Sequence, residues 1–196
     1  MKVTSIFKSI NGEVCKSGQG SWSLFVRFAG CSAKCAYCDT AYSQDPGLGS
    51  EYTPGQLAEK VLFLCLTSGI KNITITGGEP LEQSFGDFYQ FLKMICKVDL
   101  SVSIETNGLH NLDLKDPALQ KAVSFVVDYK LPSSGISEKL DRFIPFSPND
   151  FIKFVISTRE DYEVAIKKVK HWYITEYTNS SVYFSPNSKE LFPIVL

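Results

Sequence analysis

Hydrophobic and polar positions alternate along the chain in two kinds of pattern. Short runs of β-branched and aromatic residues predict strands at residues 23–28, 72–76, 100–105, 124–128, 151–156 and 181–184. Between them, apolar residues at helical spacing predict helices that begin at residue 54 and that span residues 85–96, 116–121 and 160–172. Strands that alternate with helices are typical of βαβ units, so we expect an α/β protein with a mainly parallel sheet.

The first predicted helix has the clearest start signal. Thr53 is placed to cap it, Pro54 occupies its first position, and Gln56 completes a capping box. Its apolar face is expected to hold Leu57, Val61, Leu64 and Cys65, and that of the next helix Phe85, Phe88, Leu92, Ile95 and Cys96. Two polar, turn-rich stretches, residues 43–50 and 131–148, are expected to be loops and indicate no domain boundary.

Length and charge narrow the class of protein. The 196 residues can bury a substantial core, but a complete eight-fold βα barrel needs about 250, so we expect residues 1–196 to form one domain without a complete barrel. The 20 Lys and Arg residues nearly balance the 21 Asp and Glu residues, which gives no electrostatic case for nucleic acid or a membrane surface. The sequence shows neither a membrane span nor a signal peptide, and we therefore expect a cytoplasmic protein.

Four polar sequences each follow a predicted strand, at residues 30–40, 77–80, 105–108 and 128–130. The loops after parallel strands meet at one edge of a sheet, where ligands bind. The sequence therefore predicts a single site built from all four.

Three of the six cysteines, Cys31, Cys35 and Cys38, have the spacing C-x3-C-x2-C. Three thiolates on one loop can hold three corners of a [4Fe–4S] cube, and because ordinary cubes take four cysteines, one iron would stay open to an external ligand. The alternative, a zinc site with a remote fourth ligand, is weak because His110 and His171 both lie far from the triplet in sequence.

The other three cysteines are expected to lie outside this site. Cys65 and Cys96 fit the apolar faces of helices, where a thiol packs as a small hydrophobic group. Cys15 lies in a loop rich in Gly and Ser; we interpret its position as incidental, with a redox or site role as the alternative.

The cysteine triplet, with Tyr37 before its last cysteine and with GGEP at residues 77–80, resembles the radical S-adenosylmethionine (SAM) superfamily. The resemblance implies an abbreviated, partial βα barrel with a mainly parallel sheet. It also implies a [4Fe–4S] cluster whose open iron is chelated by the amino and carboxylate groups of SAM. An electron from the reduced cluster cleaves SAM to a 5′-deoxyadenosyl radical, which abstracts a hydrogen atom from the substrate.

The same resemblance implies which residues contact SAM. Gly77 and Gly78 allow close approach of the backbone, and Glu79 can accept hydrogen bonds from the methionine ammonium group. The segment that contains Glu105 and Asn107 lines the adenosyl side in related enzymes. The implied cofactor residues are Tyr37, Gly77, Gly78, Glu79, Glu105, Asn107 and Lys130.

The N-terminal half resembles the 7-carboxy-7-deazaguanine synthase family. The likeness lies in IFKSINGE at residues 6–13, a glycine-rich turn at 18–20, FVRFAGC at 25–31 and CDT at 38–40, and it continues in order to about Ser134. That family converts 6-carboxy-5,6,7,8-tetrahydropterin to 7-carboxy-7-deazaguanine with loss of ammonia, toward queuosine and related deazapurines. The resemblance implies a lyase that acts as a homodimer, with Mg2+ and a reductant protein such as flavodoxin or ferredoxin.

The implied substrate is planar, polar and anionic, and the residues suit it. Arg27 can pair with its carboxylate through two hydrogen bonds, while Glu13 and Asn11 can bond the pterin's amide and amine edge. Asn11 stands where the family usually has Gln, which shortens the reach of its amide. Thr40 matches the family's hydroxyl ligand to Mg2+, a cation that prefers oxygen. The implied substrate residues are Asn11, Gly12, Glu13, Arg27 and Thr76.

Two other functions remain alternatives. A glycyl-radical enzyme activating enzyme shares the cysteine triplet and the GGEP loop and acts on a partner protein, but it needs neither the pterin-binding residues nor Thr40. A cluster- or zinc-binding interaction module would turn over no cosubstrate. Ser157, Ser185 and Asn187 follow late strands and are interpreted as ordinary loop residues, with ligand contact as the alternative.

Overall fold

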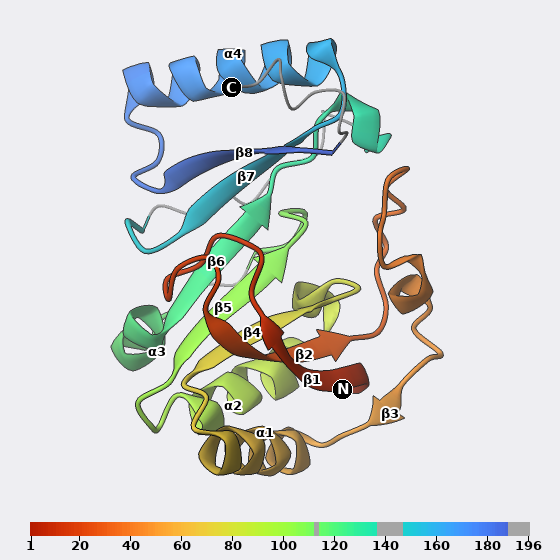
Figure 1. Ribbon diagram of the computed structural model, residues 1–196, viewed down its shortest axis with the longest axis vertical. Helices are drawn as coiled ribbons and strands as arrows, with labels where there is room; N and C mark the ends of the chain where they lie inside the picture. Colours follow the sequence, from red (N-terminus) through yellow and green to blue (C-terminus); the bar gives the residue numbers. More distant parts are fainter. Residues whose placement is uncertain (112–113, 137–146, 188–196) are drawn as a thin grey trace.

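The computed structural model describes residues 1–111, 114–136 and 147–187, and its described strands form one sheet (Figure 1). The strand order is β3-β1-β2-β4-β5-β6-β7-β8. The strands are β1 (Lys2–Ile10), β2 (Trp22–Phe28), β3 (Ser50–Glu51), β4 (Asn72–Gly77), β5 (Ser101–Thr106), β6 (Val123–Asp128), β7 (Phe151–Ile156) and β8 (Ser181–Pro186). From β2 through β8 each neighbouring pair is parallel, whereas β1 runs antiparallel to β2 and β3.

This arrangement confirms the predicted α/β class. Every strand expected from the sequence is present within a residue or two, and the mostly parallel open sheet is consistent with an abbreviated βα barrel. Strands β1 and β3 were not predicted. Strand β1 lies along β2, where Phe7 stacks on its cross-strand partner Phe25 with 5.1 Å between ring centroids.

The described helices are α1 (Pro54–Ser68), α2 (Phe85–Ile95), α3 (Pro117–Ala122) and α4 (Arg159–Thr175). Helices α1 and α2 pack together at one end of the sheet, and α4 packs along β7 at the other (Figure 1). None of the described helices is long and apolar enough to cross a membrane.

Helix α1 begins as predicted, because both hydrogen bonds of the capping box are present. The Gln56 amide donates to Thr53 Oγ1 at 3.3 Å, and the Thr53 amide donates to Gln56 Oε1 at 2.9 Å. The helix ends at Gly69, which adopts the left-handed conformation with φ of 70°. Of its predicted apolar face, Leu64 is only partly buried.

Two expectations about burial were wrong. Phe85 is 61% exposed, because it begins α2 beyond the edge of the core and stacks on Tyr89 instead. Ser43 does not lie in a surface loop: it is fully buried in a short 3-10 helix, Ala41–Gln44, where its carbonyl accepts a hydrogen bond from Gly30. Of the second turn-rich stretch, residues 137–146 lie outside the described residues, and Pro132–Ser134 forms a 3-10 turn.

The buried residues form two clusters that leave one face of the sheet for the site. The larger fills the space between the sheet and helices α1 and α2. The smaller lies under α4, where Phe154 of β7 stacks on Trp172 at 5.7 Å. Because side chains alternate along a strand, the residues between Ile152, Phe154 and Ile156 point to the opposite face.

Candidate cofactor and substrate site

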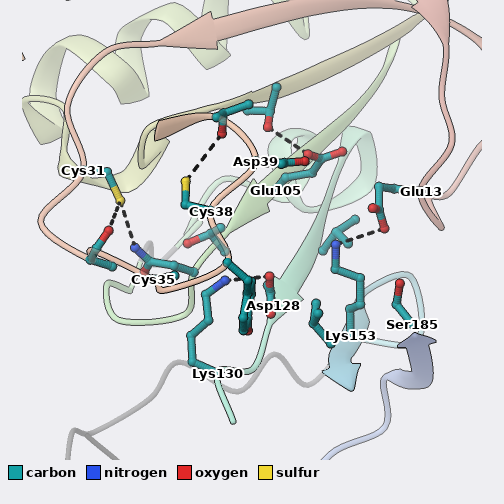
Figure 2. Close-up of a pocket in the computed structure, with 18 of the residues that line it drawn as sticks. Glu13, Cys31, Cys35, Cys38, Asp39, Glu105, Asp128, Lys130, Lys153 and Ser185 are labelled. Carbon is teal, nitrogen blue, oxygen red and sulfur yellow. Dashed lines mark hydrogen bonds and ion pairs between the residues drawn. The ribbon is translucent and has the colours of Figure 1, made fainter. Parts of the chain in front are cut away.

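The loops after the parallel strands line one cavity of about 310 Å³, which lies within the usual range for small-molecule sites, ~300–1,000 Å³. In Figure 2 the three cysteines lie together on one side of it, and Glu13 and Lys153 lie opposite. The residues proposed from sequence that line this cavity are Glu13, Arg27, Cys31, Cys35, Tyr37, Cys38, Thr40, Thr76, Gly77, Gly78, Glu105, Asn107 and Lys130. Asn11, Gly12 and Glu79 are not among its lining residues.

Strand pairing explains why residues distant in sequence converge. Arg27 on β2 lies opposite Thr76 on β4, and the Thr76 hydroxyl donates to Glu105 Oε2 at 2.8 Å. Farther along the sheet, Asp128 on β6 lies opposite Lys153 on β7. The sheet thus presents a row of polar side chains to the cavity, and burial raises the pKa of the Glu105 carboxyl despite its hydrogen bond from Thr76.

The cysteine loop is held in place by backbone hydrogen bonds. The amide of Gly30 donates to Ser43 O at 2.8 Å, and the amide of Ala36 donates to Ser134 O at 3.0 Å. On the side of Cys31 away from Gly30, the Ser32 amide and hydroxyl both donate to the Glu82 carboxylate. The loop is therefore fixed by contacts that none of the three thiols has to make.

The thiols of the triplet face the cavity in a polar environment. Burial raises the pKa of Cys31 to about 11, and burial also raises that of Cys35 against the opposing effect of Lys130. The Asn107 side-chain amide donates to Cys31 Sγ at 3.7 Å. Within the described residues, no three His, Cys, Asp or Glu side chains are grouped closely enough to hold a single metal ion.

The glycine pair lets the GGEP loop touch the cysteine loop backbone to backbone. A Cβ added to Gly78 would lie 2.0 Å from Gly30 O, and Gly77 has a φ of 123° that side chains rarely adopt. The Gly78 and Glu79 amides donate to Phe28 O and Gly30 O at 2.9 and 2.7 Å. The glycines therefore serve the contact between the two loops as well as the cavity wall.

Glu79, expected from the resemblance to contact the SAM ammonium group, lies behind the residues that line the cavity. Its carboxylate is fully buried and accepts hydrogen bonds from the Thr106 hydroxyl at 2.8 Å and from the amides of Leu81 and Asn107 at 2.9 and 2.7 Å. Burial raises the pKa of this carboxyl in spite of those donors. Glu79 joins the GGEP loop to the end of β5 and acts on the cavity through that connection.

Asn11 and Gly12, expected from the resemblance to contact the substrate, are not among the residues that line the cavity. Asn11 is 2% exposed; its Nδ2 donates to Thr74 Oγ1 at 3.1 Å, and its Oδ1 accepts from the Glu13 amide at 2.9 Å. The side chain therefore links the β1–β2 loop to Thr74 on β4. Its role in this structure is to hold the segment that carries Glu13.

The last two strands and the residue after them also contribute to the cavity, through Lys153, Val155, Ser185, Pro186 and Asn187. Lys153 was missed, and the available signal was a single lysine in the otherwise apolar strand FIKFVI. Ser185 and Asn187 line the cavity, contrary to their interpretation as ordinary loop residues, whereas Ser157 is not a lining residue and accepts a hydrogen bond from Asn187.

Comparisons with known proteins identify the family of this chain. The family model described as the radical SAM superfamily matches residues 25–172, so the chain belongs to that superfamily. The chain is 40% identical over 190 residues to the 7-carboxy-7-deazaguanine synthase of Clostridium acetobutylicum, covering 94% of this chain and 80% of that protein. It is 33% identical over 189 residues to the synthase of Methanospirillum hungatei, covering 95% and 72%. The chain therefore belongs to the 7-carboxy-7-deazaguanine synthase family.

A solved structure shows the same fold. The crystal structure of QueE from Escherichia coli matches with a TM-score of 0.70 and 18% sequence identity, over 98% of this chain and 86% of that one. A second match, Streptococcus suis SuiB bound to precursor peptide SuiA, has a TM-score of 0.55 over 82% of this chain. At these identities the likeness concerns the fold alone.

Membership of the superfamily implies a [4Fe–4S] cluster and SAM, and the residues fit both. The donor set is three thiols on one cavity wall, while Cys65 packs in the core and Cys15 donates to Gly18 O. A polar ligand is also accommodated: Asp128 Oδ1 is buried and accepts no hydrogen bond within the described part of the chain.

Proposed function

We propose that this radical SAM enzyme is a 7-carboxy-7-deazaguanine synthase. It converts 6-carboxy-5,6,7,8-tetrahydropterin to 7-carboxy-7-deazaguanine with loss of ammonia, as a carbon–nitrogen lyase of queuosine or related deazapurine biosynthesis. The observation that carries the proposal is the make-up of the cavity: the three cysteines lie on one side with Glu13 opposite them (Figure 2), and Arg27 and Thr76 also line it, which suits an anionic, amide-bearing ring.

At the cofactor end, Cys31, Cys35 and Cys38 hold the cluster. When bound, the cluster supplies the electron that cleaves SAM, and SAM supplies the radical that takes a hydrogen atom from the pterin. Lys130 donates to Asp128 Oδ2 at 2.6 Å and lies 5.6 Å from the centre of the Tyr37 ring, so these side chains form a fixed polar surface beside the cysteines. We assign SAM contacts to Tyr37, Gly77, Gly78, Glu105, Asn107 and Lys130, and an indirect role to Glu79.

At the substrate end, Arg27 binds the pterin carboxylate. Its guanidinium lies 5.9 Å from the centre of the Phe7 ring, which orients it without using its hydrogen-bond donors. Glu13 accepts from the amide and amine edge, and Thr76, already bonded to Glu105, helps to fix the plane of the ring.

We also propose that Thr40 ligates Mg2+. Thr40 and Asp39 both line the cavity directly after the cysteines, and the Thr40 hydroxyl lies 3.9 Å from Cys38 Sγ. Hydroxyl and carboxylate oxygens suit this cation, and the substrate carboxylate would complete the set. Turnover should fall when Mg2+ is removed by a chelator and return when it is added back, and a rate indifferent to chelation would remove this role.

The remaining expectations rest on the family resemblance for the dimer and the electron donor, and on the sequence for the location and the domain. They are a homodimer, a cytoplasmic location, a single domain over residues 1–196, and a flavodoxin or ferredoxin as electron donor. Sedimentation of the purified protein tests the first, and replacement of a chemical reductant by either protein tests the last. The glycyl-radical activating alternative gains nothing from the comparisons, and we do not propose it.

An anaerobic assay with the carboxytetrahydropterin, SAM and dithionite tests the main proposal. We expect 7-carboxy-7-deazaguanine without any partner protein, loss of both product and SAM cleavage in Cys35→Ala, and weakened pterin binding with residual SAM cleavage in Arg27→Ala. Reconstituted protein that cleaves SAM but never transforms the pterin would disprove the synthase proposal and leave the cluster assignment intact.

A further inference from the structure

Lys153 is a buried cation that neither the cluster nor the SAM site uses. It lies on β7 at the position opposite Asp128, between Ile152 and Phe154, which are both fully buried on the other face. Its side chain is 16% exposed and lines the cavity (Figure 2). A lysine is rarely buried to this extent without a charged partner.

The partner of Lys153 is Glu13, with 3.1 Å between Nζ and Oε2. In the part of the chain that the structure describes, this is the one ion pair of the Glu13 carboxylate. Glu13 belongs to the loop between β1 and β2, whereas Lys153 lies on β7, and β4, β5 and β6 separate the two in the sheet. The ion pair therefore joins, on the side of the cavity away from the cysteines, two elements that no strand pairing connects (Figure 2).

The surroundings of Lys153 keep its ammonium group charged. Although burial alone would lower its pKa, the carboxylates of Asp128, Glu13 and Glu105 outweigh that effect and raise the pKa. Lys130 already donates to Asp128. Of these two lysines, Lys153 is therefore the one whose charge acts on Glu13 and Glu105. Without Lys153, the carboxylates of Glu13 and Glu105 would repel each other and the anionic substrate.

We propose that Lys153 is a positioning residue of the substrate site, which holds the Glu13 carboxylate against the sheet in the orientation that receives the amide and amine edge of the pterin. The inference rests on the proposed function for the identity of the substrate, but the Lys153–Glu13 coupling is a property of the ligand-free protein. Preorganising one carboxylate removes part of the ordering cost of binding, and the retained positive charge offsets the carboxylates that would repel the substrate's own.

The variants that test this proposal are Lys153→Met, which keeps the length of the side chain without its charge, and Lys153→Arg, which keeps the charge. Lys167→Met, an exposed lysine on α4, is the matched control. For Lys153→Met we expect KM for the pterin to rise about tenfold, equivalent to ~1.4 kcal/mol, a larger effect than on SAM cleavage in the absence of pterin. Lys153→Arg should recover most of the affinity, and the control should behave as wild type.

The double variant with Glu13→Gln separates positioning from general stability. If Lys153 acts through Glu13, the two substitutions together should raise KM little more than Glu13→Gln alone, since the second change removes an interaction already lost. Additive effects, an unchanged pterin KM in Lys153→Met, or equal losses in pterin affinity and uncoupled SAM cleavage would each overturn the proposal.

The coupling can also be measured without substrate. A thermal-unfolding cycle on the four ligand-free proteins should show a smaller loss for Lys153→Met in the Glu13→Gln background than in the wild type. If this cycle shows a coupling but the wild type does not turn over the pterin, the proposed function is disproved and the Lys153–Glu13 interaction is confirmed. Turnover of the pterin without any Lys153–Glu13 coupling would support the proposed function and disprove the positioning role of Lys153.

Discussion

The carboxylate of Glu79 accepts a hydrogen bond from the hydroxyl of Thr106 across 2.8 Å, although 27 residues separate them in sequence. This bond, with those from the amides of Leu81 and Asn107, fastens the GGEP loop to the end of β5. Two of the loops that enclose the cavity thus depend on one side chain that lies behind the cavity wall and outside its lining.

Substitution of Glu79 should therefore destabilise the contact between the GGEP loop and the end of β5, on which the shape of the cavity depends. Glu79→Ala leaves three donors without their acceptor, two of them buried, and we expect a loss of about 2–4 kcal/mol in the free energy of unfolding. Glu79→Gln should lose less, because an amide oxygen at Oε1 can still accept from Thr106 and Leu81. Urea denaturation of the purified variants measures both values.

The control for this pair is Glu59→Gln, an exposed change on α1 that should alter stability by less than about 0.5 kcal/mol. A Glu79→Gln protein more stable than wild type would contradict the argument, since it would mean that burying the charge costs more than its hydrogen bonds return.

Alanine at Gly78 and at Gly86 should have effects of opposite sign. At Gly78 the new Cβ would lie 2.0 Å from a backbone carbonyl of the cysteine loop, so the loops must separate, at a cost of about 1–3 kcal/mol. At Gly86, within α2, no atom lies within 4 Å of the added Cβ, and alanine should stabilise the helix by about 0.5–1 kcal/mol.

The measurements for this second prediction are the thermal midpoint and the iron content after anaerobic reconstitution. Gly78→Ala should lower both, since it displaces the loop that carries the thiols, and Gly86→Ala should raise the first and leave the second unchanged. Full iron loading in Gly78→Ala would show that the contact between the loops is not needed to shape the cluster site.

The elements that sequence patterns identified correctly depend on neighbours a few residues away. The capping box joins Thr53 to Gln56, three positions later, and the run of aromatic and β-branched residues in β7 is contained in FIKFVI itself. Both signals are local, so composition and spacing are enough to predict them. The same holds for the cysteine triplet, whose three thiols come from one loop.

Nothing in the sequence indicated the side-chain placements that distant parts of the chain determine. Asn11 donates to Thr74, 63 residues away, and Glu79 accepts from Thr106. Lys153 was missed because only the pairing of β6 with β7 shows which face of the strand borders the cavity. Such placements follow from the order of strands in the sheet, which no short segment contains.

Asp161 should make the free energy of unfolding depend on pH in the acidic range. It is fully buried at the start of α4, and although burial alone would raise its pKa, hydrogen bonds from the amides of Ser133, Ser157 and Thr158 lower it. Because the folded pKa lies below the unfolded value of about 3.9, its contribution is complete above that pH and is lost as pH falls through the folded pKa.

Asp161→Asn tests this dependence. At about pH 7 the variant should be less stable by about 1–3 kcal/mol, since its amide group faces two backbone donors, and the difference from wild type should shrink below about pH 4. Urea titrations across this range measure it, with Asp99→Asn, a fully exposed site, as the control. A difference that stays constant with pH would exclude the carboxylate as its source.

Asn107 should raise the reduction potential of the cluster. The Leu109 amide donates to Asn107 Oδ1 at 2.9 Å, which fixes the orientation of the amide, so Nδ2 is the atom that faces Cys31 Sγ. A donor to a ligand sulfur stabilises the more electron-rich, reduced cluster. In Asn107→Asp one carboxylate oxygen can keep the hydrogen bond from the Leu109 amide, while the other repels the sulfur. We expect the reduced fraction at a given potential to fall about tenfold, ~59 mV for one electron.

Potentiometric titration followed by electron paramagnetic resonance, on reconstituted protein without pterin, measures the shift in the reduction potential. Asn107→Leu should lie between this variant and wild type, the exposed Asn149→Asp should match wild type, and an unchanged or higher potential in Asn107→Asp would rule out the hydrogen bond as a determinant.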